Sequence, residues 1–272
     1  MPTIHPTAIL TGEINLADDV EIGPYCVLGG QITLGPGVRL LQHVSLQGPL
    51  TIGEGTVVYP GASLGFEPQD YKFAPGSETA GVTIGSRCII REHTTVHAAT
   101  NLETPTKIGD GVFMMVGSHA GHDTVIGDSV ILVNGASLGG HSQVHDKAIL
   151  SGGVMVHQFC RVGRMVMCSG VTVVLGDILP FCIAAGRNQI VGLNIVGLRR
   201  SGMPKEEINE IKDIFRTVLR KNPPRSELLG ILAERGEHSK GAREMHDFVR
   251  ETNRPLATTI RKAHREMHGS AG

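Results

Sequence analysis

Residues 126–150, IGDSVILVNGASLGGHSQVHDKAIL, place an apolar residue at every sixth position. The same period recurs through most of the first 174 residues. Its aliphatic or small apolar positions are Ile4, Leu10, Leu16, Ile22, Leu28, Leu34, Leu40, Leu46, Ile52, Val58 and Leu64; then Ile84, Ile90 and Val96; then Ile108, Met114, Ala120, Ile126, Leu132, Leu138, Val144, Leu150, Val156, Val162, Cys168 and Val174. An amphipathic helix would show apolar spacings of three and four, and a half-buried strand would alternate. The period of six therefore indicates a protein built from hexapeptide repeats.

Each hexapeptide is expected to form a short strand followed by a turn. Its aliphatic residue points inward, and the glycine that often follows, as in IGDSVI, permits the bend. Three hexapeptides make a triangular coil of 18 residues, and coils stack about 4.8 Å apart with parallel pairing. The narrow interior suits aliphatic side chains, which agrees with 36 glycines and no tryptophan among 272 residues. The predicted fold class is mainly β, a parallel β-helix.

Two segments interrupt the repeat. Residues 70–83, DYKFAPGSETAGVT, break its phase and are expected to protrude as a loop. Residues 102–107, LETPTK, keep the count of six but contain Thr-Pro-Thr, which indicates a smaller excursion. Loops on a rigid scaffold often hold functional residues, so both segments are candidates for substrate contacts.

Helical signals replace the hexapeptides near the C-terminus. Pro204 precedes PKEEINEIKDIFRTVLRKN-type periodicity with acidic residues in the first turn, and Ser226 and Ser239 are expected N-caps of two further helices. We therefore expect a β-helix over residues 1–192 and a C-terminal helical domain over residues 193–272.

Charge and cysteine usage limit the function classes. Residues 1–198 contain 9 Lys and Arg against 15 Asp and Glu, whereas residues 199–272 contain 16 against 11. The basic C-terminal part could attract an acidic partner, although a solvated helical surface is the simpler interpretation. The five cysteines form no CxxC pair, the N-terminus lacks a signal-peptide pattern, and no apolar run is long enough to span a membrane. We expect a cytoplasmic protein with no nucleic-acid partner and no stable membrane insertion.

The 18-residue coil aligns several polar residues in columns. Residues 18 apart are expected to lie directly above one another on one face of the prism. One patch gathers two such columns and two flanking histidines: His122, Gly140 and Gln158; Asp123, His141 and Phe159; His119 and His157.

This patch has the components of an acyl-transfer site. His122 can accept a proton from a hydroxyl as general base, Asp123 can orient it, and the Gly140 N–H can stabilise an oxyanion. An activated thioester needs no Ser or Cys nucleophile. Two alternatives remain from the residues alone: unconnected surface histidines, or a metal site that uses His93, His97, His119 and His122, whose spacings do not obviously converge.

Six motifs carry a family resemblance that extends over nearly the whole chain. They are IHPTAI, FEPQDYKF, SHAGHDTVIG, LGGHSQV, VHQFCRVG and NIVGLRRSG. Together they resemble the UDP-N-acetylglucosamine 3-O-acyltransferase family, whose reaction begins lipid A biosynthesis. The resemblance implies a left-handed β-helix and a homotrimer with active sites between subunits. It also implies no metal and no cofactor other than the phosphopantetheine arm of acyl carrier protein, an acidic partner that delivers the acyl chain.

The resemblance also implies roles for individual residues. His122 matches the general base, Asp123 its supporting acid, and Gly140 the oxyanion donor. Further positions match substrate contacts: Asp70 and Lys72 for the sugar nucleotide; His119, His141, His157 and Gln158 for substrate; Asn194 and Arg200 for the nucleotide or the phosphopantetheine arm; and Gly170 for the end of the acyl-chain pocket. Five residues differ from those common in the family: Tyr71, Arg164, Met165, Val196 and Ser201.

The leading hypothesis is transfer of a (3-hydroxy)acyl chain from acyl carrier protein to the 3-hydroxyl of UDP-N-acetylglucosamine. An alternative is N-acylation of an amino-sugar nucleotide. Hexapeptides alone would also fit a metal-dependent hydratase similar to γ-class carbonic anhydrases, or a repeat scaffold without activity.

Overall fold

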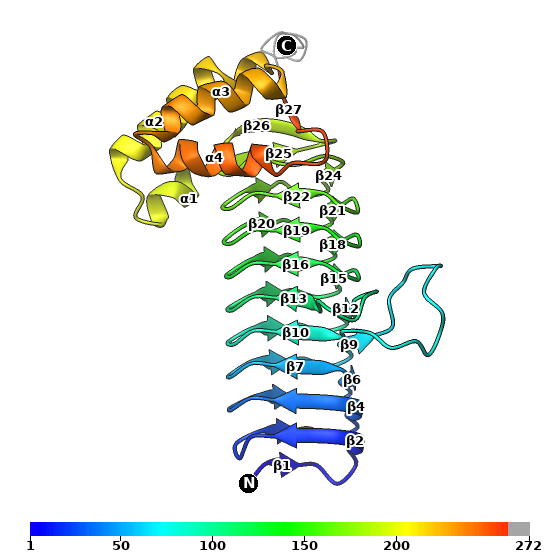
Figure 1. Cartoon of the computed structure of the whole chain (residues 1–272). Helices are drawn as coiled ribbons and strands as arrows, with labels where there is room; N and C mark the ends of the chain where they lie inside the picture. Colours follow the sequence, from blue (N-terminus) through cyan, green and yellow to red (C-terminus); the bar gives the residue numbers. More distant parts are fainter. Residues whose placement is uncertain (261–272) are drawn as a thin grey trace, which may run out of the picture.

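The computed structural model describes residues 1–260, which form a three-sided prism with a helical region at its C-terminal end (Figure 1). The prism is a left-handed parallel β-helix, as the hexapeptides and the family resemblance predicted. One face is a 12-stranded sheet: β1 (Thr3–Ile4), β3 (Glu21–Ile22), β5 (Arg39–Leu40), β8 (Val57–Val58), β11 (Ile89–Ile90), β14 (Phe113–Met114), β17 (Ile131–Leu132), β20 (Ile149–Leu150), β23 (Met167–Cys168), β25 (Cys182–Ala185), β26 (Gln189–Leu193) and β27 (Thr258–Thr259).

The other two faces belong to one 15-stranded sheet, joined through the long strands β2 (Ile9–Leu16) and β4 (Val27–Leu34). The second face contains β7 (Leu50–Ile52), β10 (Val82–Ile84), β13 (Thr106–Ile108), β16 (Val125–Ile126), β19 (Gln143–Val144) and β22 (Arg161–Val162). The third contains β6 (Ser45–Gln47), β9 (Ser63–Phe66), β12 (Thr95–His97), β15 (His119–Ala120), β18 (Ser137–Leu138), β21 (Met155–Val156) and β24 (Val173–Val174).

The core consists of the inward residues of the hexapeptides, stacked in columns. On the third face the column is almost completely buried and runs through Leu28, Leu46, Leu64, Val96, Ala120, Leu138, Val156 and Val174. Because strand side chains alternate, the residue before each of these points outward. The coil therefore fixes which polar residues reach the surface and at which level.

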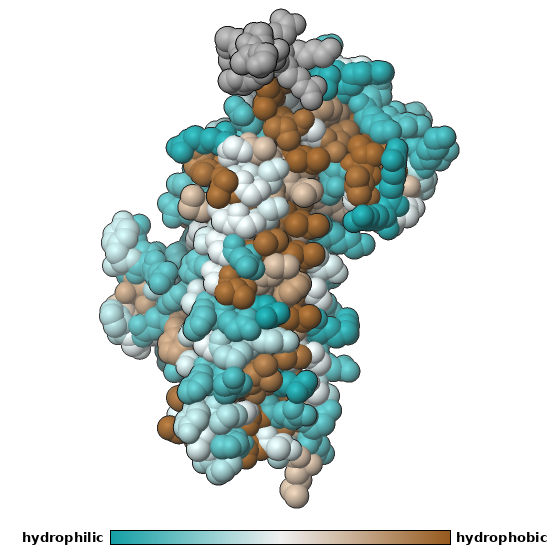
Figure 2. Space-filling view, turned by 180° about the vertical axis from the view of Figure 1, so that it is seen from behind, coloured by the Kyte–Doolittle hydropathy of each residue, from teal (hydrophilic) through white to brown (hydrophobic). Residues whose placement is uncertain are grey.

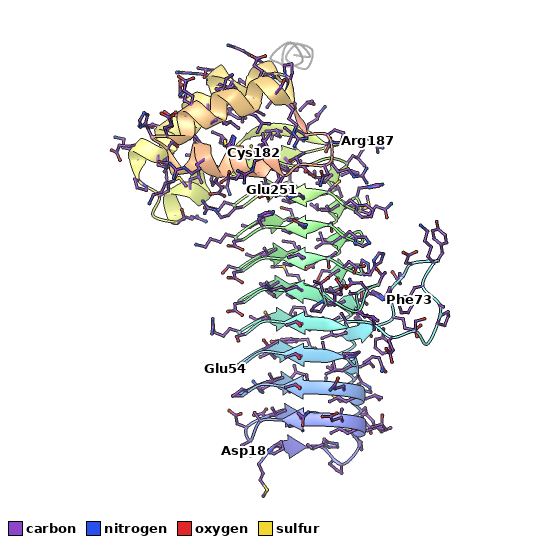
Figure 3. The ribbon with its side chains drawn as sticks, in the orientation of Figure 1. Asp18, Glu54, Phe73, Cys182, Arg187 and Glu251 are labelled. Carbon is purple, nitrogen blue, oxygen red and sulfur yellow. The ribbon has the colours of Figure 1, made fainter. Side chains whose placement is uncertain are left out.

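The two interruptions differ slightly from the predicted ranges. The protruding segment occupies residues 67–81 between β9 and β10, so β10 begins at Val82, inside the range predicted as loop. The reason is that Val82 is buried and pairs with Leu50 on one side and Thr106 on the other. Figure 3 shows this segment, with Phe73 labelled, projecting away from the prism.

The helical region comprises α1 (Ile195–Arg200), α2 (Lys205–Thr217), the short 3₁₀ helix η1 (Leu219–Lys221), α3 (Arg225–Gly236) and α4 (Lys240–Arg250). Ser239 caps α4 by accepting a hydrogen bond from the Ala242 N–H, as predicted. The cap predicted at Ser226 was wrong, because α3 begins one residue earlier, after Pro224.

Ion pairs attach α4 to the last coils of the prism. Arg164 donates to Glu244 at 2.8 and 2.7 Å, and Arg161 donates to the Phe248 carbonyl and to Glu251 at 3.1 and 3.2 Å. The division into domains at residue 193 stays a prediction, and its last part, residues 261–272, lies outside the described residues. Over residues 1–260, no helix is both long enough and apolar enough to cross a bilayer.

Candidate active site

His122 and Asp123 occupy the turn between β15 and β16, at a corner of the prism. Asp123, His141 and Phe159 stand at the same place in three successive coils, with φ of 58°, 59° and 64°. Left-handed backbone is unfavourable for residues with a side chain, and such conformations often occur at functional sites. The predicted column therefore exists, and it is built from locally strained residues.

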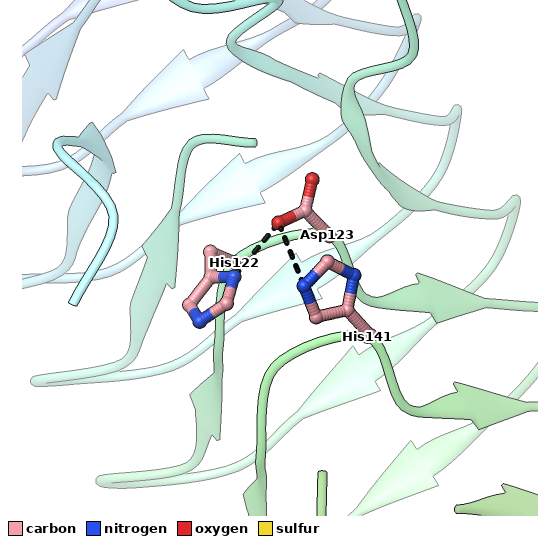
Figure 4. Close-up of side chains that lie close together, drawn as sticks. All are labelled: His122, Asp123 and His141. Carbon is pink, nitrogen blue, oxygen red and sulfur yellow. Dashed lines mark hydrogen bonds and ion pairs between the residues drawn. The ribbon is translucent and has the colours of Figure 1, made fainter. Parts of the chain in front are cut away.

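The His122 imidazole and the Asp123 carboxylate form a hydrogen-bonded pair (Figure 4). His122 Nδ1 lies 2.7 Å from Asp123 Oδ2, and His122 is 9% exposed. An ionised carboxylate can only accept, so a neutral His122 must donate Nδ1–H to it. This assignment leaves Nε2 unprotonated and available as a base.

Asp123 is held by other donors besides His122. It accepts hydrogen bonds from the Thr100 N–H at 3.1 and 3.2 Å, the Thr100 hydroxyl at 2.8 Å and the Asn101 side-chain amide at 2.9 Å. Burial raises the pKa of Asp123, but the hydrogen bonds from His122 and Thr100 outweigh it and bring that pKa below its ordinary value. The carboxylate is thus ionised at neutral pH and can stabilise a protonated imidazole.

Gly140 lies against the His122 ring. A Cβ added at Gly140 would come within 2.4 Å of both Cε1 and Nε2 of His122. Only glycine therefore allows the imidazole to keep this position, which is a close-approach role for the residue.

The Gly140 N–H has no hydrogen-bond acceptor among residues 1–260. At another corner of the prism, the residue at the same turn position donates to an aspartate in the next coil: Ser86 to Asp110, Asp110 to Asp128, and Asp128 to Asp146, at 2.8 to 2.9 Å. The corner at Gly140 lacks this internal acceptor, so its N–H can donate to a substrate oxygen.

Two further histidines flank the pair. The His141 Nε2 lies 3.6 Å from Asp123 Oδ2, and the His141 ring stacks on Phe159 with centroids 4.6 Å apart. His119 Nδ1 is 2.8 Å from the Thr95 hydroxyl. Burial, with the nearby His97 and His122, lowers the pKa of His119 to about 4. His119 is therefore a neutral imidazole at physiological pH.

The low pKa of His119 predicts a pH-dependent stability. Its ordinary value is 6.5, so between pH 6.5 and about 4 the unfolded chain binds a proton here that the folded chain does not. The free energy of unfolding must therefore fall as the pH is lowered through this window. In urea unfolding followed by circular dichroism at pH 7 and pH 5, His119→Gln should lose less stability than the wild type. Equal losses in the two proteins would refute the burial of a neutral His119.

The remaining predicted residues lie at other levels of the chain. Asp70 accepts from the Lys72 N–H within the protruding loop, His157 lies beside the Arg254 guanidinium, and Arg200 is exposed at the end of α1. Asn194 is buried: its Oδ1 accepts from the Gly197 N–H, and its Nδ2 donates to the Met165 carbonyl.

The exposed Gly170 has only the Gly152 carbonyl near its Cβ position, at 3.6 Å. The one chain thus brings together five of the predicted residues, namely His119, His122, Asp123, Gly140 and His141. Within residues 1–260, no hydrogen bond or ion pair connects this group to Asp70, Lys72, Asn194 or Arg200.

Thr100, Asn101 and Thr106 were missed by the column argument. Thr106 Oγ1 accepts from the Asp123 N–H at 2.8 Å, which adds to the Thr100 and Asn101 contacts above. The pairing of Thr95 with His119 shows why they were missed, because these partners are 24 residues apart and not 18. The small excursion adds one hexapeptide to this coil. Counting 24 residues across LETPTK would have placed this segment beside Asp123.

The same corner contains the group with metal-ligand character. Single ligand atoms of His122, Asp123 and His141 lie within 4.8 Å of one another. Of the four histidines considered earlier for a metal site, only His122 belongs to this group. The Asp123 oxygens already accept hydrogen bonds from His122, Thr100 and Asn101, which favours a proton-transfer pair over a cation site.

Comparison with known proteins gives concordant relatives. A family model described as UDP N-acetylglucosamine O-acyltransferase, domain 2, matches residues 177–257. Proteins named acyl-[acyl-carrier-protein]–UDP-N-acetylglucosamine O-acyltransferase match from Aquifex aeolicus, with 48% identity covering 93% of this chain and 97% of the relative, and from Campylobacter jejuni, with 45% identity covering 94% and 97%.

Solved structures agree over the same length. The UDP-N-acetylglucosamine acyltransferase of Francisella novicida superposes with a TM-score of 0.91 at 32% identity and covers 98% of this chain and 100% of its own. The enzyme of Moraxella catarrhalis gives a TM-score of 0.88 at 33% identity, covering 93% and 99%. Sequence identity over almost the full length and a shared prism with its helical end lead to one conclusion: the chain belongs to the UDP-N-acetylglucosamine O-acyltransferase family.

Proposed function

We propose that the protein transfers a (3-hydroxy)acyl chain from acyl carrier protein to the 3-hydroxyl of UDP-N-acetylglucosamine, the reaction that begins lipid A biosynthesis. The observation that carries the proposal is the His122–Asp123 pair beside the unpaired Gly140 N–H. The printed names of the Aquifex and Campylobacter relatives, which join the same donor and acceptor, support it.

The geometry suggests how the groups act. His122 Nε2 takes the proton from the sugar hydroxyl as its oxygen attacks the thioester carbonyl. The Gly140 N–H donates to the oxyanion of the tetrahedral intermediate. Collapse of the intermediate forms the ester and breaks the C–S bond, and the imidazolium returns the proton to the departing phosphopantetheine thiolate. Asp123 stabilises the charged imidazole throughout.

The other predicted residues receive proposed binding roles. Asp70 and Lys72 would hold the sugar nucleotide; His119, His141, His157 and Gln158 would contact the substrates near the reacting atoms. Asn194 and Arg200 would lie near the nucleotide or the phosphopantetheine arm. Since the Asn194 amide is engaged in two hydrogen bonds within the protein, we expect it to act mainly by fixing α1.

We also propose a homotrimer, supported by an apolar stripe along one face. On the 12-stranded sheet, seven outward positions in register are all apolar: Val57, Ile89, Phe113, Ile131, Ile149, Met167 and Ile183. Figure 2, seen from behind, shows a line of hydrophobic residues along the prism. A second subunit packed on this stripe would bury it, and could bring a partner's loop to the site that one chain leaves incomplete.

Gly170 is the proposed end of the acyl-chain pocket. Its Cβ position has room, with the nearest atom 3.6 Å away, so a larger side chain fits without displacing the backbone. Gly170→Met is expected to shift the preference towards shorter acyl chains, because the added side chain would occupy the space of the chain terminus. The measurement is kcat/KM over a series of acyl carrier protein thioesters. An unchanged order of preference would show that Gly170 does not measure chain length.

One assay tests the proposed function. The purified protein is incubated with acyl and 3-hydroxyacyl thioesters of acyl carrier protein, and with either UDP-N-acetylglucosamine or its 3-amino analogue. The proposal expects ester formation on UDP-N-acetylglucosamine. A higher kcat/KM for the amino analogue would indicate an N-acyltransferase instead, and no transfer to either sugar would overturn the proposal.

A further inference from the structure

A short segment outside the predicted site, Thr100–Asn101, surrounds the Asp123 carboxylate. The Thr100 N–H and hydroxyl and the Asn101 amide supply its donors besides His122. The carboxylate is mostly buried, with 7% of the side chain exposed, so these groups take the place of water around it. Its direction towards His122 therefore depends on them.

The segment is itself rigidly built. Asn101 Oδ1 accepts hydrogen bonds from the Glu103 N–H, the Thr104 N–H and the Thr104 hydroxyl. Its Nδ2 is thereby aimed at Asp123 and at the Thr104 carbonyl. The small excursion folds around one side chain, and that side chain holds the carboxylate.

The protruding loop is attached to the same segment. The Ala80 N–H donates to the Asn101 carbonyl at 2.7 Å, and the Thr79 hydroxyl donates to the Ala99 carbonyl. These contacts use backbone atoms of residues 99 and 101. The Thr100 hydroxyl has one recorded partner within residues 1–260, Asp123 Oδ2, so replacing it leaves the attachment of the loop intact.

We infer that Thr100 and Asn101 are positioning residues for the acyl transfer, which hold Asp123 so that His122 presents Nε2 to the sugar hydroxyl. The inference rests on the proposed function. Outer hydrogen bonds of this kind commonly fix the tautomer and orientation of a reactive imidazole. They should affect the chemical step more than substrate binding, since neither residue is among the proposed substrate contacts.

The test compares Thr100→Val, which removes the hydroxyl at nearly constant volume, with Thr100→Ser, which keeps it. Thr100→Val is expected to lower kcat about tenfold because a charge-assisted hydrogen bond is lost, with KM for UDP-N-acetylglucosamine changed less than about twofold. Thr100→Ser should recover most of kcat. Thr11→Val makes the same change near the other end of the prism, where the hydroxyl donates to the Leu28 carbonyl, and should leave kcat unchanged.

A second readout needs no turnover. Carbethoxylation of His122 by diethyl pyrocarbonate, located by mass spectrometry, should be faster in Thr100→Val than in the wild type, because a less firmly held pair exposes the ring more often. A wild-type kcat and labelling rate in Thr100→Val, or an equally slow Thr100→Ser, would overturn the inference. A wild-type protein that transfers no acyl chain would refute the proposed function separately, while the labelling rates still test the hold on the pair.

Discussion

His122→Ala is expected to lower kcat by about 10³-fold, with little change in KM for either substrate. The imidazole is the only group placed both to accept a proton and to be stabilised in its charged form, and general base catalysis contributes about 10²–10⁴-fold. The prism should remain folded, because Asp123 keeps its donors on Thr100 and Asn101. Initial rates at saturating substrates measure the effect.

A matched control is His5→Ala. His5 is exposed at the first coil, where its ring contacts the Thr7 hydroxyl. It should retain wild-type kcat, and both variants should show wild-type circular dichroism. If His122→Ala kept kcat within about tenfold of the wild type, His122 would not be the general base.

Gly140→Ala should have the second largest effect. The added methyl would lie 2.4 Å from the His122 ring, and the ring cannot move without breaking its 2.7 Å hydrogen bond to Asp123. A displacement of about 1 Å at a reacting group can reduce the rate about 10²-fold. We therefore expect kcat to fall by about that factor although the methyl group removes neither the imidazole nor the Gly140 N–H.

Gly152→Ala provides the comparison for that variant. Gly152 is also a corner glycine with ordinary backbone, and its Cβ position lies 3.6 Å from the nearest atom. Its kcat and thermal midpoint should match the wild type. Normal turnover in Gly140→Ala, with a crystal structure showing His122 unmoved, would contradict the close packing on which the account of this corner depends.

Much of the fold could be predicted because one local rule repeats. An inward residue every six positions specifies the coil, and Leu138 and Val156 occupy equivalent places simply because they are 18 apart. The exceptions arise where tertiary contacts decide. Val82 joins the sheet because it pairs with Leu50 and Thr106, partners that are distant in sequence. Pro224 rather than Ser226 precedes α3, and local propensity alone did not distinguish them.

The site shows the same division. His122 and Gly140 could be placed together from their spacing, and their contact is present in the structure. The Thr100 and Asn101 contacts with Asp123 could not, because the added hexapeptide changes the spacing from 18 to 24. The roles of Asp70 and Lys72 came from family resemblance alone, and their loop projects from the prism instead of covering the pair (Figure 1).

The most direct measurement is the product formed when purified protein is incubated with acyl carrier protein thioester and UDP-N-acetylglucosamine. The account predicts one acyl ester at the sugar 3-hydroxyl for each thioester consumed, identified by mass spectrometry and NMR, and almost none with His122→Ala. Binding of both substrates without ester formation, or equal ester formation by wild type and His122→Ala, would contradict it.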